Sequence, residues 1–189
     1  MCIRLLGSLL ALLTAFAVSP AFADEYSDTL NVFRKAGESA GFFSHSYGYA
    51  MFPTIGKGGI GIGGAYGTGR VYVKGKHVGD TSVAQVTVGL QLGGQAYSEI
   101  IFFQDSRAFH EFTTGNFEFG AEASAVAITA GASAQASTTG TGAGASTSSS
   151  SAATTGRYQK GVAVFTVAKG GLMYEAAIGG QKFSYKAKK

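Results

Sequence analysis

The sequence predicts an α+β fold that is mainly β: an N-terminal helix followed by a curled antiparallel sheet, sandwich-like or barrel-like, with Gly-rich turns. Near the N-terminus, apolar residues recur at helical spacing in one stretch. From residue 47 onward, alternating apolar runs separated by glycine pairs dominate, which is typical of short antiparallel strands. The chain contains 29 glycines, and this content permits the sharp bends that a curled sheet requires.

Residues 1–23 have the features of a signal peptide. Arg4 precedes a mostly apolar run, and Ala21-Phe22-Ala23 forms a small-x-small cleavage site. The alternative is an N-terminal membrane anchor, but Pro20 and the alanine pair favour cleavage. We therefore expect an exported protein, periplasmic or secreted and in either case able to associate with a membrane. Residues 24–189 then form a single domain.

The mature chain lacks cysteine, because the one cysteine of the sequence is Cys2. Disulfides and thiolate metal sites are therefore not expected. The whole chain carries a net charge of +4, and its basic residues concentrate in residues 56–79 and 156–189. Two interpretations of these segments stay open. They form one basic face that meets phosphates, or they are solvated lysines on strand edges that discourage edge pairing.

The N-terminal helix is expected over Asp28–Phe43. Leu30, Phe33, Gly37 and Ala40 share one face of such a helix, and the acidic residues at its start suit a helix N-terminus. The glycine within this stretch weakens the helix, because glycine costs about 1 kcal/mol relative to alanine in a helix interior.

The first strands are expected around Val71–Val73, with Tyr72 pointing outward, and over 86–92. In the second strand, every other residue is apolar, which predicts a half-buried strand with one buried face: Val86, Val88, Leu90 and Leu92. Gly93-Gly94 then predicts a hairpin turn. Ile100–Phe103 is apolar on both faces, which indicates a central or covered strand.

A short helix is expected over Asp105–Phe112, with Phe109 and Phe112 pointing inward. A strand follows from Phe117 to Ala125. Residues 131–156 are almost entirely Gly, Ala, Ser and Thr, and this composition predicts a mobile insertion.

Three closely spaced strands are expected after the insertion, over 161–168, 172–178 and 181–186. Gly170-Gly171 and Gly179-Gly180 separate them, and such tight turns predict an antiparallel meander. The Gly-rich segment Tyr49–Lys74 is unsuited to a helix or an ordinary core strand. It predicts a place where the backbone closely approaches another strand or a bound group.

Four short strings occur in a fixed order along the chain. They are Phe52-Pro53-Thr54-Ile55-Gly56-Lys57-Gly58-Gly59, then Gly93-Gly94-Gln95 through Ile100-Ile101-Phe102, then Gly170-Gly171-Leu172-Met173-Tyr174-Glu175, and last Gly180-Gln181-Lys182-Phe183-Ser184-Tyr185. Together they resemble the SYLF domain family, lipid-binding domains that are also described as the las seventeen-binding actin regulators. The resemblance covers about residues 28–186.

The resemblance implies a non-enzymatic domain that binds anionic, phosphoinositide-like phospholipids through a basic and apolar N-terminal segment. The matching segment here contains Arg34 and Lys35, flanked by phenylalanines. Two cations are few, so the prediction adds Lys57, Lys182 and Lys186 as lipid-binding residues. The alternative for the flanking phenylalanines is that they belong to the core: Phe33, Phe42, Phe43 and Phe52.

Other chemistry has little support in the sequence. Gly59, Gly61 and Gly64 fit G-x-G-x-x-G, but a strand pattern follows where a dinucleotide site needs a helix. The three histidines, at 45, 77 and 110, are widely spaced and do not form a metal motif. We expect no cofactor, no metal, no nucleic-acid partner and no enzymatic activity.

The sequence thus leads to one hypothesis and one alternative. The hypothesis is binding of anionic phospholipid membrane surfaces. The alternative is a structural or protein-interaction module of the envelope. Such a module would bind a protein partner, as the actin regulators do, or associate with itself, and residues 131–156 would mediate the assembly.

Overall fold

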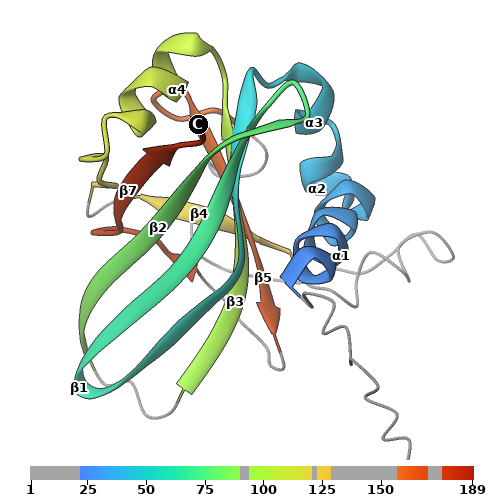
Figure 1. Ribbon diagram of the computed structural model, residues 1–189. Helices are drawn as coiled ribbons and strands as arrows, with labels where there is room; N and C mark the ends of the chain where they lie inside the picture. The colour runs from blue at the N-terminus through green and yellow to red at the C-terminus, as the bar shows by residue number, and fades with distance from the viewer. Residues whose placement is uncertain (1–21, 90–93, 121–122, 129–156, 170–175) are drawn as a thin grey trace, which may run out of the picture.

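The computed structural model describes residues 22–89, 94–120, 123–128, 157–169 and 176–189. These residues form a seven-stranded, mainly antiparallel sheet with strand order β6-β4-β5-β3-β1-β2-β7 (Figure 1). The strands are β1 (Gly48–Val73), β2 (Lys76–Gly89), β3 (Gly94–Phe103), β4 (Ser124–Ile128), β5 (Val162–Lys169), β6 (Ala176–Ala177) and β7 (Lys182–Ala187). The helices are α1 (Phe22–Lys35), α2 (Gly37–Ala40), α3 (Phe42–His45) and α4 (Ser106–Thr113).

The mainly β class with helical structure at the N-terminus is confirmed. The described strands form one curved sheet whose order ends at β6 and β7. The sandwich-like or barrel-like detail stays a prediction. Among the described residues, no helix combines the length and apolar character that crossing a bilayer requires.

The sheet has two sides, which are named here for use below. The outer side is covered in part by α1–α3 and carries one apolar cluster, which includes Phe33, Met51 and Phe102. The inner side faces α4 and the concave interior, and its larger cluster includes Phe52 and Phe183. Side chains alternate along each strand, so every strand residue can be assigned to one side.

The prediction of a helix over Asp28–Phe43 is confirmed in part: the segment is largely helical, but it is divided into α1, α2 and α3. Ala36 has an extended backbone, with φ −75° and ψ 122°, and separates α1 from α2. The hydroxyl of Ser39 donates to the carbonyl oxygen of Phe33 at 2.6 Å, which holds this break in place. Phe33 and Ala36 are buried against the sheet, as the helical pattern indicated.

The Gly-rich segment makes β1 double back on itself (Figure 1). Its first half pairs with β3 and its second half with β2. A Cβ added to Gly69 would lie 2.6 Å from Cδ1 of Phe52 and 2.6 Å from the carbonyl oxygen of Met51, and one added to Gly67 would lie 2.7 Å from Cγ1 of Ile55. The close approach predicted for this segment is therefore that of the other half of the same strand.

The prediction for the 86–92 strand has the wrong face at Val86, and residues 90–92 lie outside the described residues. On β2 the buried residues are Val83 and Gln85, whereas Val86 is 77% exposed. The predicted hairpin at Gly93-Gly94 is also wrong, because β1 lies between β2 and β3 in the sheet. Tyr72, which was expected to point outward, is instead half-buried against the outer cluster, where its ring stacks on Tyr49 at 5.1 Å.

Two central elements agree with their predictions. Ile100–Phe103 lies in β3, between β1 and β5, and its four side chains are fully buried. In α4 the Asp105 side chain accepts a hydrogen bond from the Ala108 backbone at 2.9 Å, which is an N-cap. Phe112 is buried in the inner cluster, and Phe109 packs against it.

The predicted C-terminal meander is wrong. β5 pairs with β3 and β4, β6 pairs with β4, and β7 pairs with β2, so the three strands are not sheet neighbours. The β4–β5 pair is parallel, which departs from an all-antiparallel sheet. A turn occurs at Gly180, with φ 76°, but it joins strands at opposite ends of the sheet order. Residues 131–156 and Gly170-Gly171 lie outside the described residues.

Candidate functional site: an exposed apolar patch beside lysines

One region of the outer side exposes large apolar side chains. Along the β1–β2 pair, Gly64 lies opposite Val86 and Tyr66 opposite Ala84, so these residues share the outer side. Ile62 lies on the same side of β1 as Tyr66. The exposed fraction is 61% for Tyr66, 77% for Val86 and 71% for Ile62. Ile62, Tyr66, Ala84 and Val86 are called the outer patch below.

The outer patch is exposed because α1–α3 cover only the neighbouring part of the sheet. Arg70 lies on the same side of β1 as Tyr66, four positions further along the strand. Its guanidinium lies 4.0 Å from the ring centroid of Tyr26 in α1. Farther along the outer side, towards Ile62, the sheet carries no helix in Figure 1. The side chains that would form the core face of an ordinary covered sheet therefore face solvent.

A set of polar contacts, called the clamp here, holds α1 against the sheet. The ammonium of Lys169 donates to Oε1 of Glu25 at 2.9 Å and to the hydroxyl of Thr54 at 2.6 Å, and that hydroxyl donates to Glu25. These hydrogen bonds, first from Thr54 and then from Lys169, hold the pKa of Glu25 below its ordinary value. The clamp joins α1 to β1 and β5, so the boundary between covered and uncovered sheet is well defined.

Lys182 borders the outer patch, and Lys186 lies farther along the same strand. In the β2–β7 pair, Lys182 lies opposite Ala84 of the patch, and Lys186 lies opposite Asp80. Because Phe183 between them is buried on the inner side, both lysines point to the outer side. Lys182 also forms an exposed ion pair with Glu118 at 3.4 Å. The structure therefore places one of the sequence-predicted cations, Lys182, next to the outer patch and a second, Lys186, on the same side of the sheet.

The other predicted cations lie elsewhere. Arg34 and Lys35 end α1 on the outer side, and the Arg34 guanidinium lies 5.4 Å from the ring centroid of Phe43. Lys57 shares the inner side with Ile55, since the two alternate with Gly56 along β1. The structure thus does not bring all five residues together. Lys182 and Lys186 lie on β7 on the outer side, Arg34 and Lys35 end α1, and Lys57 lies on the inner side.

Four phenylalanines considered for membrane contact are packed in the structure. Phe33 and Phe52 are fully buried, and Phe42 and Phe43 pack against the outer cluster. Phe43 meets Phe102 edge-on at 4.9 Å. These four side chains therefore belong to the core, which was the alternative to membrane contact. Within the described part of the chain, the large aromatic side chain that is exposed is Tyr66, which the sequence pattern did not single out.

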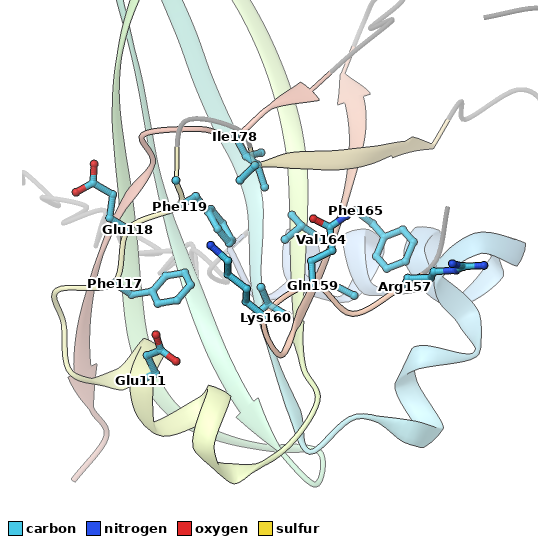
Figure 2. A pocket seen from close by; sticks show the side chains of 14 residues that line it. Glu111, Phe117, Glu118, Phe119, Arg157, Gln159, Lys160, Val164, Phe165 and Ile178 are labelled. Carbon is cyan, nitrogen blue, oxygen red and sulfur yellow. The ribbon is translucent and has the colours of Figure 1, made fainter. Parts of the chain in front are cut away.

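A cavity of about 350 Å³ opens on the other part of the molecule, between the segment after α4 and the start of β5 (Figure 2). Its walls are mainly apolar, and Arg157, Lys160, Glu111 and Glu118 supply its charged groups. No sequence pattern pointed to it, because its residues come from four separated segments.

The interior holds a buried polar cluster. The side-chain nitrogen of Gln181 lies 3.0 Å from the Tyr97 hydroxyl and 3.1 Å from Oε2 of Glu99. Burial raises the pKa of Glu99 to about 8, although the hydrogen bond from Gln181 acts in the opposite direction. The carboxyl group is therefore mostly protonated at neutral pH. Gln181 belongs to one of the family strings, and its place here is structural.

The geometry of the described residues does not support a metal-binding or nucleotide-binding site. Across the described ranges, His, Cys, Asp and Glu form no cluster that could hold a metal ion. His77 is instead within 2.9 Å of Oδ1 of Asp80. Gly59, Gly61 and Gly64 lie within β1, so no helix N-terminus faces a phosphate there.

Comparison with known proteins places the chain in a family. The sequence profile of the Las17-binding protein actin regulators matches residues 84–187, more than half of the chain. Beta cell expansion factor A of Aeromonas veronii is 26% identical over 158 residues, which are 82% of this chain and 51% of that protein. The chain thus spans about half the length of this relative. It belongs to the Ysc84 family, the Las17-binding protein actin regulators, whose domain is also called SYLF.

Proposed function

We propose that the chain binds anionic phospholipid surfaces through the outer patch and the lysines on the same side of the sheet. One observation carries this proposal: Ile62, Tyr66 and Val86 are exposed together on the side of the sheet to which Lys182 and Lys186 point. Apolar side chains that enter the headgroup region next to lysines are the usual chemistry of peripheral membrane binding. Family membership supports the same direction.

The expected affinity is modest. Burying one large aliphatic or aromatic side chain contributes about 1.5–3 kcal/mol, and each lysine near an anionic surface contributes about 1 kcal/mol. Part of this is lost because Lys182 already pairs with Glu118 and because binding orders the side chains. We therefore expect reversible binding that grows with the anionic lipid fraction and weakens as salt rises.

Arg34 and Lys35 remain candidates for a second contact. They end α1 on the outer side, so a membrane that meets the outer patch could also approach them. Lys57 points to the inner side and contributes to the same contact only if the surface curves around the sheet. These three residues therefore test the orientation of the bound molecule.

Vesicle flotation tests the proposal. The chain is mixed with phosphatidylcholine vesicles that contain rising fractions of phosphatidylglycerol or of a phosphatidylinositol phosphate, at low and high salt. We expect the combined change Ile62→Ser, Tyr66→Ser and Val86→Ser to remove flotation. Lys182→Glu with Lys186→Glu should lower it about tenfold at low salt, because two favourable charges become repulsive.

Matched controls make the same chemical changes elsewhere. Val32→Ser replaces an exposed valine on α1, and Lys57→Glu reverses a charge on the inner side. Both should leave flotation nearly unchanged. Loss of flotation with Lys57→Glu but not with the patch variant would place the contact on the other side of the sheet and overturn the proposal.

The alternative is a protein-interaction module that uses the same exposed patch. It predicts no flotation under any lipid condition, together with self-association or partner binding that the patch variant abolishes. Deletion of residues 131–156 separates the two functions further. Lipid binding should survive that deletion, whereas assembly through the insertion should not.

A further inference from the structure

The buried polar cluster of the interior includes three side-chain oxygen atoms to which the described part of the chain offers no hydrogen-bond partner. They are Oε1 of Glu99, Oγ1 of Thr166 and Oε1 of Gln181. All three residues are fully buried. A buried polar atom without a hydrogen bond destabilises the fold, so such atoms are rare in folded proteins and three in one cluster point to a common partner.

Two of these atoms come from neighbouring strands. Glu99 of β3 lies directly opposite Thr166 of β5. Both side chains point to the inner side, since Ile101 and Val164, two positions away on the same strands, belong to the inner cluster. Facing side chains of an antiparallel pair have Cβ atoms about 4.5–5.5 Å apart. The carboxyl and the hydroxyl are therefore close enough for one molecule of the size of water to contact both.

Gln181 reaches the same place from the far end of the sheet order. It directly precedes β7, which β1 and β2 separate from β3. Its N–H donates to the Ile178 carbonyl at 3.1 Å, and its carbonyl accepts from the Phe119 N–H at 3.0 Å. Its side-chain nitrogen donates to the Tyr97 hydroxyl and to Oε2 of Glu99. The amide thus crosses the concave interior in a fixed position.

The hydrogen-bonding capacities of the three atoms match one water molecule. Burial raises the pKa of Glu99 to about 8, so its carboxyl is mostly protonated at neutral pH. Because Oε2 accepts from Gln181, the proton belongs on Oε1, which then needs an acceptor. Oε1 of Gln181 is an acceptor, and the Thr166 hydroxyl can accept as well. A water that accepts from Glu99 and donates to the other two makes three bonds, the usual number for a buried water.

A metal cation suits the cluster less well. It would require the ionised form of Glu99, which burial disfavours. Across the described ranges, no group of carboxylates and histidines that could hold a metal ion includes Glu99. The other oxygens are neutral, and a desolvated cation needs a compensating charge. The cluster therefore favours an uncharged ligand that both donates and accepts.

We propose that the interior of the fold binds a water molecule that bridges Glu99 of β3, Thr166 of β5 and Gln181 before β7. The water extends the contact between Gln181 and Tyr97 into a polar bridge across the concave side of the sheet. This bridge ties the start of β7 to two strands that are not its neighbours in the sheet. It acts as a non-covalent cross-link that holds the curvature of the sheet. The site is independent of the outer patch, which lies on the other side.

Magnetic relaxation dispersion of the water nuclei tests the proposal on the full chain in solution, because it counts water molecules that stay bound while the protein tumbles. Thr166→Val removes the hydroxyl and keeps the shape of the side chain. We expect this variant to hold one long-lived water fewer than the unmodified chain. Glu99→Gln should keep the water, since its amide nitrogen can donate in place of the carboxyl proton.

Thr81→Val is the matched control. Thr81 is also buried on the sheet, but its hydroxyl donates to the Ser184 carbonyl at 2.7 Å. The same chemical change there should leave the count of long-lived waters unchanged.

Urea unfolding measures the bridge independently. Replacing a buried hydroxyl that has no partner by valine is neutral or stabilising, whereas replacing one that bonds to a water removes a hydrogen bond. We therefore expect Thr166→Val to lower the ratio of folded to unfolded chain at least about fivefold. Vesicle flotation of this variant should equal that of the unmodified chain, because the outer patch is unchanged.

A crystal structure that shows ordered waters, before and after a soak in thallium(I), identifies the bridging molecule. We expect electron density within hydrogen-bond distance of Glu99 and Thr166, without an anomalous thallium signal. Thallium at this position would indicate a monovalent cation site and would overturn the proposal. An unchanged count of long-lived waters in Thr166→Val would overturn it too, as would a stability that this variant leaves unchanged or raises.

Discussion

At the scale of single residues, Glu99 sets the pH dependence of stability. Its carboxyl group is fully buried, and its pKa is raised from 4.5 to about 8 in the folded protein. The unfolded chain therefore releases this proton at a lower pH than the folded chain. Between about pH 4.5 and pH 8 the folded state holds more protons, so the free energy of unfolding falls as pH rises.

Glu99→Gln should remove this dependence. The amide keeps the shape and polarity of the protonated carboxyl but does not ionise. We expect the variant to match the unmodified chain near pH 4.5 and to be more stable by up to a few kcal/mol at pH 8 and above, since each pKa unit corresponds to about 1.4 kcal/mol. Urea unfolding at pH 5, 7 and 8.5 measures the difference, and a constant difference across this range would contradict the prediction.

At the scale of elements, the doubled strand β1 depends on glycines whose neighbours leave no room for a side chain. Gly69→Ala should destabilise the fold by about 1–3 kcal/mol, because its Cβ would overlap the Phe52 ring and the Met51 carbonyl oxygen. Gly56→Ala is the matched control on the same strand, where an added Cβ meets nothing within 4 Å. Thermal unfolding should show a lower Tm for Gly69→Ala and an unchanged Tm for Gly56→Ala.

Some elements could be predicted from local sequence signals, whereas the pairing of the strands could not. Local signals were sufficient for α4, where Asp105 caps the helix, and for the central strand at Ile100–Phe103. Strand partners were not predictable, because a tight turn such as that at Gly180 does not determine which edge a strand joins. Val86 was assigned to the core because alternation identifies two faces without saying which of them is covered.

The candidate site was predictable only in part. Lys182 and Lys186 were selected from the basic C-terminal segment. Lys182 lies opposite Ala84 of the outer patch and Lys186 opposite Asp80, and their role in lipid binding stays a prediction. Tyr66 and Ile62 were missed because they lie among glycines that dominated the pattern. The cavity at the β5 edge could not be foreseen, since its walls depend on tertiary pairing between Phe119 and β7.

At the scale of the whole molecule, β7 holds one end of the sheet. It pairs with β2 along six residues, and the Thr81 hydroxyl donates to the Ser184 carbonyl at 2.7 Å. A chain that ends at Gly180 should therefore fail to fold, because Phe183 is lost from the inner cluster and the β2 edge is left unpaired. Circular dichroism and urea unfolding measure this, and removal of Lys189 alone, which leaves β7 intact, is the control.

The β2–β7 pair joins parts of the chain that are about a hundred residues apart, as the separation of 103 residues between Thr81 and Ser184 illustrates. Such long-range pairing makes folding slow, because the loop must be closed before the contacts that stabilise it can form. During synthesis, β2 emerges long before its partner. The β2 edge thus stays unpaired until nearly the whole chain has been made, so its pairing with β7 is a late step of folding.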